Sequence, residues 1–180
     1  MCKKVMGSLF YINRIKENFD KSTRIEVVET LVLSLINYCL RIWGSTNKTQ
    51  IKRVQKLQNF AAKVAHGNSR KYDYATPIIN ELKWLKVEQK CFNDICTVTY
   101  KILRGKLPNW LFTLPTVEQV RQVGTRQNKD LYIPRVRTNM GGRAIDIKGP
   151  VCWNKLPDSI KEVRSFPVFK KKLKEYLLLS

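Results

Sequence analysis

The sequence predicts a mainly α-helical protein of the α+β class: a helical bundle with a small C-terminal β-hairpin and a terminal helix. Apolar residues recur at three- and four-residue steps through most of the first 105 residues, as they do on the buried face of a helix. Residues that cap and stop helices stand at the ends of these segments. Further along, two alternating segments flank Gly141-Gly142, which is the pattern of a hairpin.

The first 70 residues are predicted to form a unit of three helices. The first helix covers 3–18, with its apolar residues on one face. The second begins near Ser22 and continues to about Ile42, and a turn at Trp43-Gly44 leads into the third. The third helix ends at His66 and carries an apolar stripe along one side.

Capping residues support these boundaries. Thr23 and Glu26 have the spacing of a capping box at the start of the second helix, with Ser22 as the competing N-cap. Asn47 is the expected N-cap of the third helix, since its side-chain oxygen can accept from a free backbone N–H. Gly67 is the expected stop, because glycine readily adopts the left-handed conformation that ends many helices.

Residues 71–180 are predicted to form a C-terminal region that stays helical to 114. Thr76-Pro77 starts a short apolar helix, with proline in the first turn where a missing N–H is tolerated. A longer helix covers 86–104 and closes at Gly105.

The remainder of this region is less regular. Residues 115–150 are expected to be irregular apart from a hairpin of 131–138 and 143–148, where Pro134 restricts the first strand to a sheet edge. The C-terminal helices are predicted over 156–179, with Ser165 capping the last one.

Charge is the most unusual property of the composition. The 180 residues include 34 Lys and Arg against 14 Asp and Glu, a net charge of +20, and the basic residues are spread along the chain. A folded chain with this field should bind polyanions, of which nucleic acid is the commonest. The longest apolar run is too short to span a bilayer and no signal peptide is recognised, so we expect no membrane partner and an intracellular location, nuclear or cytoplasmic.

The sequence gives no pattern of a catalytic, metal or cofactor site. Five scattered cysteines and the single His66 do not have the spacing of zinc ligands. A Ser or Cys nucleophile would lack a second histidine to activate it. We therefore expect no catalytic residue, no metal and no cofactor, and reduced, buried thiols.

The third helix carries the first candidate binding surface, which comprises Lys48, Lys52, Arg53, Lys56 and Lys63. No acidic residue interrupts this face between residues 46 and 65, so it is suited to a phosphate backbone. The competing interpretation is a solvated helix face.

A second candidate surface lies around the predicted hairpin. Arginine with an exposed aromatic ring can hold single-stranded RNA by ion pairing and stacking, and Tyr132 is the aromatic candidate. The alternative is that Tyr132 packs and the arginines are dispersed. The arginines are Arg121, Arg126, Arg135, Arg137 and Arg143.

Three tryptophans are interpreted as core anchors. Trp84 and Trp153 each lie near a leucine, and Trp43 closes the second predicted helix. Large aromatic side chains of this kind contribute more often to core packing than to a binding platform.

Several segments, in their order along the chain, resemble a known family. They resemble the region just beyond the palm in non-LTR (LINE-type, jockey-like) retrotransposon reverse transcriptases, and they cover almost the whole chain in the family's order. The segments are Tyr38 to Gly44, Val54 to Lys63, Leu82 to Leu85, Tyr100 to Gly105 with Pro108, Thr125-Arg126, Gly149 to Pro157, and Phe169 to Lys174.

The resemblance implies the thumb and C-terminal region of such an enzyme without its catalytic palm. The family uses palm carboxylates, including a Tyr-x-Asp-Asp turn, to hold two metal ions. The aspartates of this chain are isolated, so it should not polymerise DNA alone. The implied partners are RNA or DNA template–primer, bound without sequence preference, and the missing palm and finger domains. A protein-interaction or dimerisation module, and a remnant without a selected function, are the alternatives.

Overall fold

The computed structural model describes residues 2–38, 40, 47–67, 74–108, 113–121 and 129–179. These residues are mainly helical, as the sequence predicts. They belong to two compact units, Met1–Cys91 and Phe92–Ser180. The predicted domain boundary at residue 70 stays a prediction.

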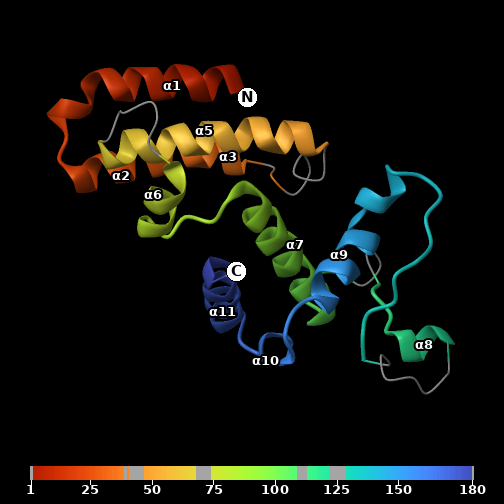
Figure 1. The fold of residues 1–180 in the computed structure, drawn as a ribbon. Helices are drawn as coiled ribbons and strands as arrows, with labels where there is room; N and C mark the ends of the chain where they lie inside the picture. The colour runs from red at the N-terminus through yellow and green to blue at the C-terminus, as the bar shows by residue number, and fades with distance from the viewer. Residues whose placement is uncertain are drawn as a thin grey trace. The chain divides into compact units, whose positions relative to one another are not determined.

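The first unit is built around one long amphipathic helix, α5. Helices α1, α2 and α6 pack against it, and Figure 1 shows α1 and α6 beside α5. The buried core comes from the apolar stripe of each helix, for example Val5 and Leu9 of α1 and Ala61 of α5, which are all inaccessible to solvent. The helices are α1 (Cys2–Ile15), α2 (Lys21–Val28), α3 (Ser34–Asn37), α5 (Lys48–His66) and α6 (Ala75–Glu81).

The second predicted helix begins and continues differently from the expectation. Its N-cap is Asp20, whose carboxylate accepts from the backbone N–H groups of Ser22 and Thr23, so neither of those two residues is the cap. The helix passes through a π-helical stretch, Glu29–Leu33, and α3 ends before the extended Tyr38. The predicted turn at residues 43–44 lies outside the described residues.

The predicted ends of two later helices are confirmed. Asn47 Oδ1 accepts from Thr49 N at 3.2 Å and caps α5. Gly67 ends α5 at φ 85°, and Gly105 follows α7 (Val87–Leu103) at φ 62°. Both glycines adopt left-handed values that cost other L-residues energy, which explains why the sequence marks these positions so clearly.

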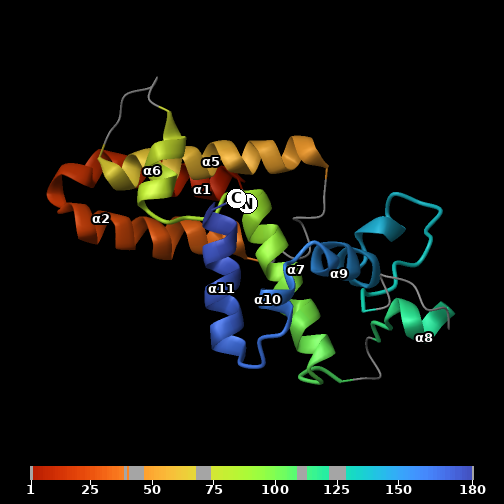
Figure 2. The same ribbon diagram turned by 60° about the horizontal axis from the view of Figure 1, so that its bottom comes forward.

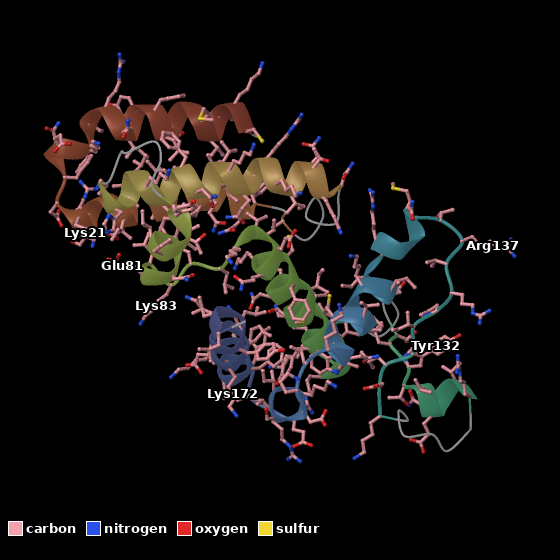
Figure 3. All side chains as sticks on the ribbon, viewed as in Figure 1. Lys21, Glu81, Lys83, Tyr132, Arg137 and Lys172 are labelled. Carbon is pink, nitrogen blue, oxygen red and sulfur yellow. The ribbon has the colours of Figure 1, made fainter. Side chains whose placement is uncertain are left out.

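An ionic cluster joins α6 to α2 and α5. Glu81 lies 2.9 Å from the Lys21 ammonium and 3.2 Å from Nε2 of His66, and the approach of Lys21 and Glu81 is visible in Figure 3. The hydrogen bond and charge of Lys21, followed by His66, lower the pKa of the Glu81 carboxyl. His66 thus has a structural partner in the fold.

Glutamine side chains attach the segment after α6 to α5. Gln58, which is buried, donates to the carbonyl oxygen of Leu85 at 2.8 Å. Gln55 accepts from the backbone N–H of Val87 at 2.9 Å. Since buried backbone groups need partners, these two residues allow an irregular segment to lie on the core.

The second unit is organised around Tyr100, which is fully buried in the second half of α7. Its ring stacks on Phe169 of α11 at 4.3 Å between centroids and lies 6.4 Å from Trp153 of α9. Figure 2 shows α9, α10 and α11 around this part of α7. The remaining helices are α8 (Val117–Arg121), α9 (Ile145–Asn154), α10 (Asp158–Lys161) and α11 (Phe166–Leu179).

The predicted β-hairpin is wrong. In the part of the chain that the structure describes, the only strand-like pairing of the predicted hairpin is an isolated bridge from Leu131 to Thr116, which lies outside the hairpin. Asn154 takes the place of a strand partner, since its side chain accepts from Leu131 N at 3.0 Å and donates to Leu131 O at 2.9 Å. Ile133 and Val136 remain 44% and 45% exposed, so the alternation does not bury a face.

The second predicted strand is instead the start of α9. Residues 141–143 form a 3-10 turn, and α9 begins at Ile145. The helix includes Gly149 and Pro150, which in a sequence normally indicate a turn. Gly149 is buried against Thr99, and a β-carbon there would lie 2.9 Å from the Thr99 hydroxyl oxygen. Close packing therefore explains a glycine inside this helix.

Candidate nucleic-acid interface

The outer face of α5 places four of the predicted basic residues together. Lys48, Lys52 and Lys56 follow one another at four-residue steps and are exposed, and Arg53 is exposed beside them. We call these four residues the α5 basic row. Because a helix rises about 1.5 Å per residue, the three lysines extend over about 12 Å. Phosphates of one strand follow every 3.4 Å or so along the duplex axis, so the row matches several successive phosphates.

The charges of the α5 basic row are not neutralised within the first unit. The helix itself contains no Asp or Glu. The ion pairs given by the described residues of this unit join Lys16 to Glu17 and Glu81 to Lys21 and His66. None of these pairs involves the row, which therefore presents four positive charges to solvent.

Lys63 differs from the rest of its predicted group. It lies near the C-terminal end of α5 and is half-buried, and it makes an interaction of its own. Its positive charge is stabilised by the negative C-terminal end of the helix dipole, which is a sufficient structural reason for a lysine there.

The predicted arginine group is only partly assembled. Arg121 is exposed at the end of α8, and its guanidinium lies 5.8 Å from the centroid of the half-buried Tyr132 ring. Arg135 and Arg137 are exposed in the irregular segment that follows, and the side chains of Tyr132 and Arg137 are labelled in Figure 3. Arg143 is also exposed, with its Nη1 3.4 Å from the sulfur of Met140. Arg126 lies outside the described residues.

The tryptophans that the structure describes are buried. Trp84 is 7% exposed and Trp153 is 8% exposed. Trp153 packs against Tyr100 and lies 5.9 Å from Phe169, between ring centroids. Neither indole forms a platform for a base, and Trp43 lies outside the described residues.

Sequence reasoning missed the outer face of α1. Opposite the buried stripe of this helix lie exposed basic and aromatic residues, and the helix has no Asp or Glu. Phe10 is 58% exposed and Tyr11 is 66% exposed, and the Phe10 ring lies 5.9 Å from Phe60 of α5. The signal was present, because the residues are separated by steps of seven, four and three, which place them on one helical face: Lys3, Lys4, Phe10, Tyr11 and Arg14.

The described residues include three buried thiols, Cys91, Cys96 and Cys152, and one exposed thiol, Cys2, for which the prediction of burial is wrong. They contain no group of three His, Cys, Asp or Glu side chains that could hold a metal ion. Burial, and then the nearby Cys152, raises the pKa of the Cys96 thiol. Burial also raises the pKa of Cys152, so these two thiols stay protonated at neutral pH and are poor nucleophiles.

Comparison with known proteins gives no relative. No model of a protein family matches the chain, and no curated protein or solved structure does so. The geometry of the basic surfaces therefore carries the functional argument. Within the described residues, no helix has the length and apolar character needed to cross a bilayer.

Proposed function

We propose that this chain binds nucleic acid through its phosphate backbone, with the α5 basic row as the main contact. The supporting observation is the spacing of Lys48, Lys52 and Lys56, which lie exposed at four-residue steps on one face. The net charge of +20 adds a long-range attraction for polyanions. Contacts of this kind involve phosphates and not base edges, so binding should be largely independent of sequence.

The resemblance to non-LTR reverse transcriptases suggests the form of the nucleic acid. A thumb grips template and primer together, so an RNA–DNA duplex is the first candidate ligand. We propose that the chain corresponds to the thumb and C-terminal region of such an enzyme and is non-catalytic by itself. Its described residues support that view only in being helical and basic.

Salt dependence of binding tests this function directly. Each phosphate neutralised by a basic side chain contributes about −0.9 to the slope of log K against log salt concentration. The triple variant K48Q/K52Q/K56Q should therefore reduce the slope for an RNA–DNA duplex by about 2.7. The matched control K171Q/K172Q/K174Q removes three exposed lysines of α11. Wild-type affinity that does not change with salt concentration, or an equal reduction of the slope in the two variants, would contradict the proposal.

An exposed apolar stripe supports a second candidate, a self-association or protein-interaction surface. Leu31 is 55% exposed, Leu35 is 36% exposed and Tyr38 is 74% exposed, at steps of four and three residues. Exposed apolar residues in a row indicate a protein contact more often than isolated ones do. Light scattering across protein concentrations tests self-association. A dimer that L31E/L35E converts to a monomer would support it, and a monomer at every concentration would exclude it.

A further inference from the structure

Three lysines surround one aromatic ring in the second unit. The ammonium nitrogens of Lys101, Lys106 and Lys170 lie 5.1, 5.4 and 5.7 Å from the centroid of Phe166. The residues come from the last turn of α7, the segment after it and the first turns of α11. We call this group the Phe166 lysine cluster. It shares no residue with the α5 basic row.

The backbone brings two of these lysines together. After α7, Gly105 adopts φ 62° and donates to Ile102 O at 3.1 Å, while Lys106 N donates to Lys101 O at 2.8 Å. This pair of hydrogen bonds is the Schellman arrangement. In this motif an apolar contact frequently forms between the two residues at the positions that Lys101 and Lys106 occupy here. Here both residues are lysines, so the motif places two positive charges at a position that usually holds apolar side chains.

Helical spacing supplies the third lysine. Phe166 is the first residue of α11, and Lys170 follows it at the four-residue step that aligns side chains on one face. The Phe166 ring is half-buried, whereas Lys106 and Lys170 are exposed, so the cluster opens to solvent. A molecule from solvent can therefore approach the ammonium groups directly.

The cluster concentrates charge that its surroundings do not neutralise. Lys161 pairs with Asp130 and Asp158, and neither of these two ion pairs involves the three lysines. All three nitrogens lie within 5.7 Å of one centroid, so no two of them are more than about 11 Å apart, a separation comparable with the Debye length of about 8–10 Å. A cation–π contact at an exposed site is weak, so the Phe166 ring leaves the ammonium groups able to bind an anion.

We propose that the Phe166 lysine cluster binds a phosphate group with two or more negative charges. A phosphate monoester carries about −1.5 to −2 at neutral pH, which suits three cations gathered around one ring better than a singly charged diester does. Pyrophosphate has the same chemistry. The ligand is either a small phosphate compound of this kind or the terminal phosphate of a nucleic-acid strand.

Calorimetric titration of the full chain with pyrophosphate tests the site. Wild type should bind one equivalent, and K101Q/K106Q/K170Q should bind at least tenfold more weakly. The control K171Q/K172Q/K174Q has the same net charge but retains the cluster, so its affinity should fall less than threefold. Circular dichroism establishes that each variant folds. Absence of binding to the wild type, or equal weakening in both variants, would overturn the proposal.

Two oligonucleotides then identify the source of the phosphate. A strand with a 5′-phosphate is compared with the same strand carrying a 5′-hydroxyl. A preference for the phosphorylated strand that K101Q/K106Q/K170Q abolishes assigns the site to strand ends. Pyrophosphate binding without that preference assigns it to small phosphate compounds. The duplex titration of the α5 basic row uses 5′-hydroxyl strands, so failure of one proposal is separate from failure of the other.

Discussion

The indole Nε1 of Trp84 donates a hydrogen bond of 2.6 Å to Oε1 of Glu29, which lies 55 residues earlier in the chain. Glu29 is the first residue of the π-helical stretch, and Trp84 follows α6. The bond joins two irregular segments of the first unit and gives the buried indole its polar partner. Buried tryptophans usually find such a partner, because an unsatisfied N–H in the core costs free energy.

Replacing Trp84 should therefore destabilise the first unit. W84F removes the donor and part of the ring, and we expect the free energy of unfolding to fall by about 2–3 kcal/mol. E29Q keeps an acceptor oxygen but removes its charge, and its loss should be about 1 kcal/mol. Urea denaturation followed by circular dichroism measures both. A W84F variant within about 0.5 kcal/mol of wild type, the range of an ordinary surface substitution, would show that the contact is unimportant.

Asp20 should make stability depend on pH at the acid end. Hydrogen bonds from Ser22 and Thr23 hold the pKa of the Asp20 carboxyl well below its usual range, and the bond from the Ser22 hydroxyl has the largest effect. The folded-state pKa is thus lower than the unfolded value of about 3.9. The stabilisation is present above that value and is lost as pH falls through the folded pKa.

The variant D20N isolates this effect. Asparagine retains a side-chain oxygen that caps the helix but does not titrate. Wild type should have the higher melting temperature at pH 7, and the difference from D20N should shrink steadily between pH 4 and pH 2. Thermal denaturation at several pH values measures this difference in melting temperature. The carboxylates that both proteins share contribute equally to each melting temperature, so their contributions cancel in the difference. A difference that stays constant with pH would contradict the assignment.

Three helix caps show where sequence reasoning succeeds and where it does not. Asn47 and Gly67 are recognisable because each acts on the backbone within a few residues of itself. Asp20 acts equally locally, but it competes with the Thr23 and Glu26 pattern, and only the hydrogen bonds decide between them. Capping motifs thus predict the presence of a helix end better than its exact residue.

Long-range partners explain the larger errors. The alternation after residue 130 satisfies the local pattern of a strand, but the side chain of Asn154 takes the hydrogen bonds of Leu131. Near Phe166, Lys101 and Lys106 lie 69 and 64 residues before Lys170, and no sequence periodicity connects them. The α5 basic row, by contrast, belongs to a single helix, so its spacing alone predicts which side chains share a face.

Gly149 should be intolerant of even one added methyl group. A β-carbon at this position would lie 2.9 Å from the hydroxyl oxygen of Thr99, which is fully buried and donates to Ile95 O at 3.0 Å. Overpacking of this kind costs about 1–3 kcal/mol, and it should exceed the gain in helix propensity. We expect G149A to be destabilised by about 1 kcal/mol.

A double-mutant cycle tests whether the Thr99 hydroxyl causes this cost. T99A removes the atom in conflict, so G149A should be neutral or stabilising in that background. T99V serves as the control, because it replaces the hydroxyl with a methyl group of similar size and leaves the conflict in place. Free energies of unfolding from urea titration give the coupling. Additive effects of G149A and T99A would show that the helix accommodates alanine by another movement.

Gly7 and Gly105 should respond to alanine with opposite signs. Neither has an atom within 4 Å of an added β-carbon, so crowding does not distinguish them. Gly7 lies within α1, where alanine is favoured over glycine by about 0.5–1 kcal/mol. Gly105 has φ 62°, a left-handed value that costs other residues about 1–2 kcal/mol. G7A should therefore raise the melting temperature, and G105A should lower it.

The same pair of variants connects backbone geometry to the proposed phosphate site. If G105A opens the Schellman turn, the N–H of Lys106 no longer donates to Lys101 O, and the two ammonium groups separate. Pyrophosphate affinity should then fall severalfold in G105A and stay unchanged in G7A. Melting temperatures and calorimetric titrations on the same samples provide the measurement. Unchanged affinity in a destabilised G105A would show that the lysines gather around Phe166 without help from the turn.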